Sequence, residues 1–199
     1  AQRLEKMGRI AANNSPLPAD QKYSVIYADP PWKFETWGEE SGSERAAPYP
    51  TMTMDEICAL DIGSLVSVPA ILFLWVDRQH HYEAKERLAK AWGPIVANDP
   101  AIRWEWTYRY DYIWDKVHIG RGFGNRDQHE HLLVFTIGDV PMPLPELRVG
   151  SVYREARGEH SDKPAYFRDL INSQYGTLPK IELFAREAAP GWDVWGNQA

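Results

Sequence analysis

The sequence predicts an α/β fold in which a mixed, mostly parallel sheet carries helices on both faces. Residues 71–76 are apolar at every position, as expected of a strand that is covered on both sides. Strand patterns alternate with helical ones along the chain, which is typical of parallel strands joined by helices. With 199 residues and a hydrophobic content of 44%, the chain can form one well-filled domain.

Composition and patterning bound the organisation of the chain. We expect residues 1–20 to form an N-terminal helix and linker, and residues 21–199 to form the domain itself. Cys58 is the single cysteine, which excludes an internal disulfide and favours a reducing compartment. The sequence has no signal-like start and no apolar run near the roughly 20 residues of a membrane span, so we expect a cytoplasmic protein. With a formal net charge of −6, binding to nucleic acid would require a local basic patch.

The first predicted strand, residues 23–28, ends at the sequence Asp29-Pro30-Pro31-Trp32. Neither proline has a backbone N–H, and each restricts the preceding residue to extended conformations, so the Asp29 carboxylate and the Pro30 carbonyl form a fixed pair of acceptors. Trp32 adds a flat apolar surface beside them. This combination suits a planar ring that carries an amino group, such as adenine. The alternative is a turn that caps the strand, with Trp32 in the core.

A loop and two helices are predicted around the second strand. The polar residues 33–50, rich in Gly and Ser, form a candidate lid over the end of the first strand. A capping-box pattern opens a short helix over residues 53–60. After the strand at residues 71–76, Asp77 can cap a helix over residues 79–92.

Residues 103–115 alternate between aromatic and mostly charged side chains, which predicts a strand with one aromatic core face. Residues 129–136 predict another strand. His129 and His131 flank Glu130 at its start, but a lone His-x-His motif lacks the three or four ligands that a metal site needs. We therefore predict a polar cluster at this position and no metal.

Three elements complete the predicted sheet and its covering. A strand near residues 149–154 precedes a helix over residues 164–176, which Ser161 or Asp162 can cap. The final strand spans residues 180–186. Ligands of open α/β sheets bind at the carboxyl ends of strands, so the polar groups at these ends are expected to line one crevice.

Seven motifs follow one another along the chain. They are Asp29-Pro-Pro-Trp32, Tyr49-Pro-Thr-Met52 with Asp55-Glu56 after it, Leu72-Phe-Leu-Trp-Val76, His129-Glu-His131, Ser161-Asp-Lys-Pro164, Lys180-Ile-Glu-Leu-Phe-Ala-Arg186 and Gly196-Asn-Gln198. Together they resemble the MT-A70 family of adenine-N6 methyltransferases over nearly all of residues 23–198. The resemblance implies a Rossmann-like methyltransferase fold that uses S-adenosylmethionine, in the permuted arrangement where the catalytic motif precedes the main cofactor strand.

The resemblance also implies roles for individual residues. The catalytic motif corresponds to Asp29, Pro30, Pro31 and Trp32. The cofactor-binding positions correspond to Asp29, Lys163, Arg186, Asn197 and Gln198, and the target-base pocket to Trp32, Tyr49 and Glu130. The chain departs from well-known members in having Ala188-Ala189 where they carry His-Asn, and Asp162 in place of a histidine.

The chemistry of an exocyclic amine explains why such a motif needs two acceptors. The lone pair of the adenine amino nitrogen is delocalised into the ring, so this nitrogen is a poor nucleophile. Hydrogen bonds from its two N–H groups to the Asp29 carboxylate and the Pro30 carbonyl favour a pyramidal nitrogen, whose lone pair can attack the sulfonium methyl group in line. The methylated nitrogen then loses its proton to Asp29 or to water. Trp32 and Tyr49 are expected to hold the ring by stacking.

The sequence leaves the substrate and the assembly state open. The small size of the chain resembles prokaryotic or phage members and favours DNA, with RNA as the alternative. A catalytically silent nucleic-acid-binding partner subunit, and a methyltransferase for protein or small molecules, are the other hypotheses. The chain can act alone, as a homodimer or with a partner subunit.

Contact with a polyanion is expected to come from a basic patch beside the crevice. Its members lie on or after the aromatic strand and ahead of the motif at residues 161–164: Arg103, Arg109, Lys116, Arg121, Arg126, Arg148, Arg154 and Arg157. Arg121 and Arg126 are the predicted contacts to the substrate backbone.

Overall fold

The computed structural model describes residues 16–18, 20–33, 50–96, 99–120, 124–158 and 162–196. Its strands are β1 (Tyr23–Ala28), β2 (Val66–Val76), β3 (Ile95–Val96), β4 (Asp99–Arg103), β5 (Thr107–Asp115), β6 (His129–Ile137), β7 (Val152–Arg154), β8 (Lys180–Leu183) and β9 (Asp193–Trp195). Its α-helices are α2 (Met54–Cys58), α3 (His81–Glu83), α4 (Ala89–Ala91) and α5 (Ala165–Tyr175). Shorter helical segments are η2 (Ile62–Leu65), η4 (Pro145–Leu147) and the π-helical η3 (Ala84–Leu88), which joins α3 to α4.

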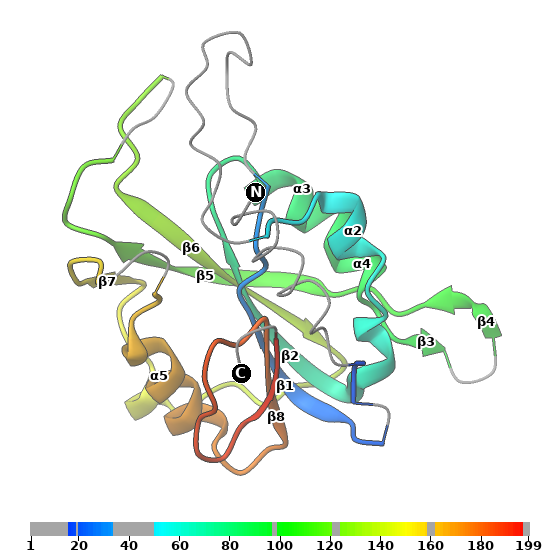
Figure 1. The fold of residues 1–199 in the computed structure, drawn as a ribbon. Helices are drawn as coiled ribbons and strands as arrows, with labels where there is room; N and C mark the ends of the chain where they lie inside the picture. The colour runs from blue at the N-terminus through cyan, green and yellow to red at the C-terminus, as the bar shows by residue number, and fades with distance from the viewer. Residues whose placement is uncertain are drawn as a thin grey trace, which may run out of the picture.

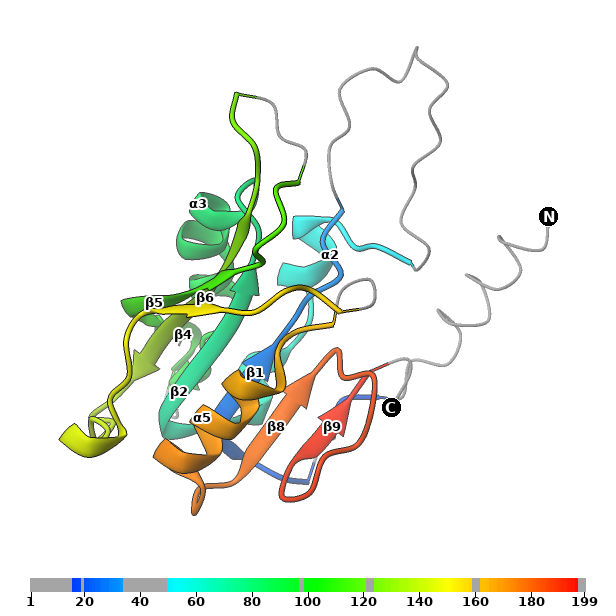
Figure 2. The same ribbon diagram turned by 90° about the vertical axis from the view of Figure 1, so that its left-hand side faces the viewer.

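One sheet of seven strands forms the centre of the described structure, in the order β7-β5-β6-β2-β1-β8-β9 (Figure 1). β6 runs antiparallel to β2 and to β5, whereas the other neighbouring strands are parallel. Figure 2 shows β1, β8 and β9 side by side. The predicted α/β class with a mixed, mostly parallel sheet is confirmed.

Alternate side chains of the central strands build one core on each face of the sheet. On one face, Ile26 and Leu72 pack in a cluster that includes Ile57 of α2. On the other face, Phe73 packs in a cluster that includes Phe167 of α5. Figure 1 accordingly shows α5 on one side of the sheet and α2, α3 and α4 on the other. No helix among the described residues is both long enough and apolar enough to span a bilayer.

The aromatic residues around β5 do not share one face, so that prediction is wrong. β5 begins at Thr107, and a register shift between Tyr108 and Tyr110 interrupts its pairing with β6. An extra residue in one strand changes the face that the following side chains occupy. Trp114 therefore packs on the α5 side of the sheet, whereas Trp106 belongs to the opposite core.

The two longer helices lie close to their predicted positions. The Asp77 carboxylate accepts hydrogen bonds from the backbone N–H groups of Gln79 and His80, but these belong to the turn before α3, whose N-cap is His80, so Asp77 does not cap the helix as predicted. α5 follows Pro164, but no side chain among the described residues caps its first turn. The Asp162 carboxylate instead accepts a hydrogen bond from Arg186 at 3.1 Å, so the predicted Asp162 cap is wrong.

The end of the chain holds an element that the sequence did not suggest. The predicted strand at residues 180–186 ends at Leu183, because Phe184 has a φ of 62°, which a strand cannot continue. β9 then adds a further parallel strand at the edge of the sheet. The predicted N-terminal helix, the Ser161 cap and residues 34–49 of the predicted lid lie outside the described residues.

Candidate active site

Asp29 lies at the carboxyl end of β1, where its backbone N–H donates to the Leu183 carbonyl of β8 at 3.4 Å. The chain that follows is fixed by its own backbone. The Pro30 carbonyl accepts a hydrogen bond from the Trp32 N–H at 2.9 Å, and the Pro31 carbonyl accepts one from Met52 at 2.7 Å. The two prolines thus give the strand the rigid exit that the sequence predicts.

A lysine and a second carboxylate complete the surroundings of Asp29. Lys163 Nζ donates to both carboxylate oxygens of Asp29, at 2.8 and 2.7 Å. The same ammonium lies 3.3 Å from Glu130 Oε2, and Lys116 lies 3.1 Å from Glu130 Oε1. The side chains of Lys163, Asp29 and Glu130 are 14%, 26% and 22% exposed. Two carboxylates and two ammonium groups therefore form one partly buried network.

Burial and charge act against each other within this network. Burial raises the pKa of Asp29 above its usual value of 3.8; Lys163 opposes this increase and Glu130 adds to it. For Glu130, burial is outweighed by Lys163 and Lys116, so its pKa is lowered. Burial would lower the pKa of Lys163, but the two carboxylates raise it. Lys163 is therefore charged at neutral pH.

Trp32 is a core residue in this structure. It is 6% exposed, its Nε1–H donates to the Trp75 carbonyl at 3.1 Å, and its ring stacks on His80 with a centroid distance of 4.8 Å. A ring covered in this way offers little surface to a substrate base. The expectation that Trp32 stacks on the substrate therefore does not fit, whereas the alternative that placed it in the core does.

The structure describes only some of the other predicted site residues. Arg186 follows β8 and pairs with Asp162. A Cβ on Gly196 would lie 2.2 Å from the Ala185 carbonyl oxygen, so the segment before Asn197 packs closely against the segment before Arg186. Of the predicted cofactor and base-pocket residues, Tyr49, Asn197 and Gln198 lie outside the described part of the chain.

Some of the predicted basic patch lies at the same end of the sheet as Asp29. Lys116 follows β5 directly and contacts Glu130. Arg154, at the end of β7, lies 3.5 Å from Asp115. Arg126 donates to the Gly120 carbonyl at 2.8 Å, within the loop that joins β5 to β6. Arg121 of the same loop is not among the described residues.

Three members of the predicted patch lie elsewhere, so the grouping is wrong for them. Arg109 donates to Thr136 near the other end of β6, because it belongs to the start of β5. Arg103 donates to the Gly93 carbonyl beside β3 and β4. Arg148 follows η4, whose Leu147 carbonyl accepts a hydrogen bond from Gln174 near the end of α5. Antiparallel reversals and the long connection after β6 separate residues that the linear order grouped together.

Arg78 lies at the same end of the sheet as Asp29 and was not considered in the sequence analysis. It donates to Asn125 at 2.9 Å and pairs with Asp127 at 3.1 Å, so it joins the loop after β2 to the loop between β5 and β6. Its place two residues after Val76 was the available signal, because the carboxyl end of a central strand commonly carries site residues. The link from Lys163 to Glu130 had no such local signal.

The mixed, mostly parallel sheet with a polar network at the carboxyl ends of its central strands is consistent with the Rossmann-like α/β fold of methyltransferases. The particular family follows from comparison with known proteins. The model of the MT-A70 family matches residues 23–198. This chain therefore belongs to the MT-A70 family, as its seven motifs indicate.

Three relatives show how far the likeness extends. The Type II methyltransferase M.MunI of a Mycoplasma species is 33% identical over 195 residues, which cover 88% of this chain and 77% of that protein. Human N(6)-adenine-specific methyltransferase METTL4 is 27% identical over 188 residues, covering 88% of this chain and 37% of METTL4. The Type II methyltransferase M.HhaII of Haemophilus parahaemolyticus is 31% identical over 128 residues, which cover 59% of this chain and 50% of M.HhaII. The chain thus matches most of M.MunI and half or less of the other two.

Proposed function

We propose that this chain transfers a methyl group from S-adenosylmethionine to the N6 amino group of adenine in DNA. Membership of the MT-A70 family supports methyl transfer, and the likeness to an N(6)-adenine-specific methyltransferase supports adenine as the target. The likeness to two type II methyltransferases, one of them over most of its length, favours DNA over RNA. The observation that carries the proposal is the position of Asp29 at the carboxyl end of β1, where Lys163 holds its carboxylate and two prolines follow it.

Both acceptors keep capacity for a substrate amine. A carboxylate offers about four lone-pair sites and a carbonyl two. Lys163 engages two sites on Asp29, and the Trp32 N–H engages one on Pro30. One N–H of an adenine amino group can therefore be accepted by Asp29 and the other by Pro30, without breaking the bonds that hold these groups in place.

The residues of the chain act on the nucleophile. Asp29 and Pro30 orient the amino nitrogen and favour its pyramidal form, which localises the lone pair. Asp29 then stabilises the positive charge that develops on this nitrogen and can accept its proton. When bound, S-adenosylmethionine supplies an electrophilic methyl group. Lys163 holds the Asp29 carboxylate in place throughout.

The donors and acceptors around Asp29 fit the charged groups of S-adenosylmethionine. The Lys163 ammonium suits its carboxylate, and the carboxylates of Asp29 and Glu130 suit its cationic groups. All three N–H bonds of Lys163 have partners, so binding would exchange its longest contact, 3.3 Å to Glu130, for the cofactor carboxylate. We assign further cofactor contacts to Arg186, Asn197 and Gln198, because Gly196 packs closely against Ala185, next to Arg186.

The target base would then lie on the side of Asp29 that faces Glu130. We assign Tyr49 and Glu130 to the pocket for this base, since Trp32 is covered. An adenine must leave its stack to reach Asp29, so unpaired adenines should react at least as readily as paired ones. Arg126 and Lys116, on the adjoining loop, are the groups that would approach the phosphate backbone.

The test is transfer of labelled methyl groups to matched DNA and RNA oligonucleotides, single- and double-stranded, with and without adenine. Digestion to nucleosides identifies the methylated base. We expect N6-methyladenine in the DNA and no label where adenine is absent. Label on another base would contradict the proposal. Label found only in RNA would show that the substrate is RNA and not DNA. Binding of S-adenosylmethionine without transfer to any of these polymers would favour the silent partner subunit.

A further inference from the structure

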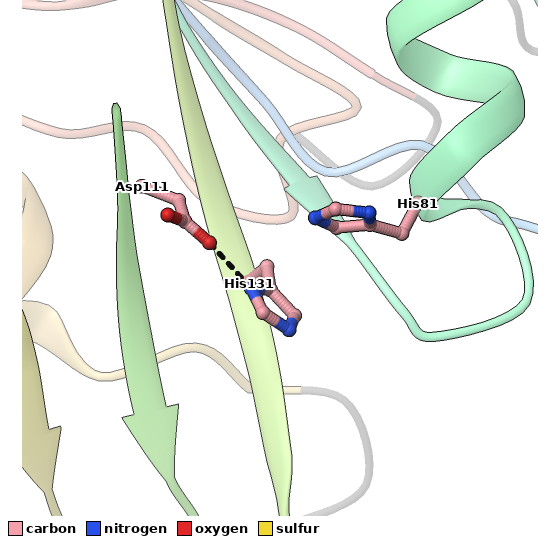
Figure 3. A group of neighbouring side chains, drawn as sticks. All are labelled: His81, Asp111 and His131. Carbon is pink, nitrogen blue, oxygen red and sulfur yellow. Dashed lines mark hydrogen bonds and ion pairs between the residues drawn. The ribbon is translucent and has the colours of Figure 1, made fainter. Parts of the chain in front are cut away.

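A group of polar side chains next to the candidate active site, His81, Asp111 and His131, plays no part in the proposed methyl transfer. One ligand atom from each lies within 4.8 Å of the other two. His81 is on α3, Asp111 on β5 and His131 on β6, and Figure 3 shows the three side chains close together. The prediction of no metal considered only the His-x-His motif, because nothing in the sequence placed His81 and Asp111 beside it.

We propose that this cluster binds one divalent transition-metal ion of the zinc class, with His81, Asp111 and His131 as its protein ligands. Imidazole nitrogen and carboxylate oxygen are common zinc ligands. Around a tetrahedral ion with bonds of about 2.0–2.1 Å, ligand atoms lie about 3.3 Å apart. Atoms that already lie within 4.8 Å of one another can reach this spacing by rotation of the side chains. Water completes the coordination.

Two hydrogen bonds orient the Asp111 carboxylate for metal binding. Its Oδ2 lies 2.6 Å from His131 Nδ1, and its Oδ1 accepts a hydrogen bond from the Tyr108 hydroxyl at 3.0 Å. The first of these contacts shares a proton that a cation can replace. The second remains as an outer hydrogen bond, as is usual for carboxylates that bind metals.

A third imidazole lies beside the three ligands. His129 Nε2 is 3.2 Å from His131 Nε2, the ring nitrogen that does not face Asp111, so His129 is an outer hydrogen-bond partner of the ligand His131. The rings of His81 and His131 are 4.7 Å apart, centroid to centroid. A set rich in imidazole favours transition metals over Mg²⁺ or Ca²⁺, which prefer oxygen ligands.

The place of the cluster in the fold suggests what the ion would do. His81 directly follows His80, whose ring stacks on Trp32 of the catalytic motif. An ion bound by His81, Asp111 and His131 would tie the start of α3 to β5 and β6, beside the network that contains Glu130. We therefore expect the ion to stabilise the fold rather than to take part in methyl transfer.

The test uses the full chain after treatment with a chelator and desalting. Zn²⁺ is titrated by calorimetry, and Co²⁺ is followed by the visible absorption of its tetrahedral complexes. Wild-type protein should bind one ion per chain, with a higher melting temperature in Zn²⁺, because a ligand that binds only the folded state stabilises it. An excess of Mg²⁺ should not compete.

The matched variants are His81→Ala with His131→Ala, and Asp111→Asn, which keeps the size and polarity of the side chain. Each should weaken Zn²⁺ binding at least tenfold while the metal-free melting temperature shows that the variant is folded. His118→Ala, which removes an exposed histidine from the loop after β5, should bind Zn²⁺ as the wild type does. Wild-type protein without saturable binding, or binding of equal strength in the His81/His131 variant, would overturn the proposal.

Discussion

Lys163 and Asp29 form a two-point ion pair across 134 positions of sequence: one ammonium group donates to both oxygens of one carboxylate, at 2.8 and 2.7 Å. The pair joins the segment just before α5 to the end of β1. Because Lys163 also contacts Glu130, it neutralises two carboxylates that would otherwise repel each other. We infer that Lys163 positions Asp29 as well as contributing to the cofactor site.

Replacing Lys163 with methionine should lower the free energy of unfolding by about 2–4 kcal/mol. Removing one member of a buried ion pair costs about 3–5 kcal/mol, and partial exposure of this pair reduces the cost. Urea denaturation at neutral pH measures the change. Lys116→Met is the matched control, since Lys116 contacts Glu130 but not Asp29, and its effect should be smaller. Equal destabilisation of the two variants would contradict the special role of Lys163.

Substitutions of Trp32 should act through stability. Trp32→Phe keeps an aromatic ring next to His80 but removes the hydrogen bond to the Trp75 carbonyl, at a cost of about 1–2 kcal/mol. Trp32→Ala also empties a core position, at about 3–5 kcal/mol. Thermal or urea unfolding gives these values. If Trp32→Phe raised the KM for an oligonucleotide without loss of stability, the stacking role would be restored.

At acidic pH, the decrease of kcat/KM should follow the protonation of Asp29. The ionised carboxylate is the stronger acceptor for a substrate N–H and the form that can take up its proton, so kcat/KM falls as Asp29 becomes protonated. Its pKa is raised by burial and, in part, by Glu130. Activity should therefore be lost at a higher pH than for an exposed aspartate, and Glu130→Gln should move this loss to lower pH. If Glu130→Gln lost activity at the same pH as the wild type or at a higher pH, Asp29 would not control this loss.

Arg126→Gln should weaken binding of DNA and lower its dependence on salt. Removal of one contact to a phosphate should reduce the slope of log affinity against log salt by roughly 0.7–0.9. Arg109→Gln makes the same chemical change at the other end of the sheet, where Arg109 contacts Thr136, and should leave the slope unchanged. Fluorescence anisotropy with one labelled oligonucleotide over a salt series compares the two. Equal slopes in both variants and in the wild type would exclude Arg126 from the interface.

Local patterns in the sequence predicted the central elements well. The apolar run at residues 71–76 is the buried part of β2, and the alternation of apolar and turn residues placed β1, β6 and α5. β1 ends just before Asp29, Pro30 and Pro31, because proline has no backbone N–H to continue the strand pairing. These features depend on nearest neighbours in sequence, which is why they could be predicted.

The remaining features depend on contacts between distant residues. A bulge at Tyr108–Tyr110 cannot be distinguished from regular alternation until the partner strand is known. β9 has only three residues, too few for a periodic pattern. The contacts of Lys163 with Asp29 and Glu130, and those of His81 with His131, arise only when the sheet order brings their segments together.

The most direct test of the central claim compares wild type with Asp29→Ala in one assay, the formation of N6-methyladenine in an adenine-bearing DNA oligonucleotide from labelled S-adenosylmethionine. Loss of one preorganised acceptor should slow transfer by about a hundredfold or more. Calorimetry on the same preparation should show that S-adenosylmethionine still binds, with at most a moderate loss of affinity. Transfer at the wild-type rate by folded Asp29→Ala would contradict the assignment of Asp29 as the residue that holds the nucleophile.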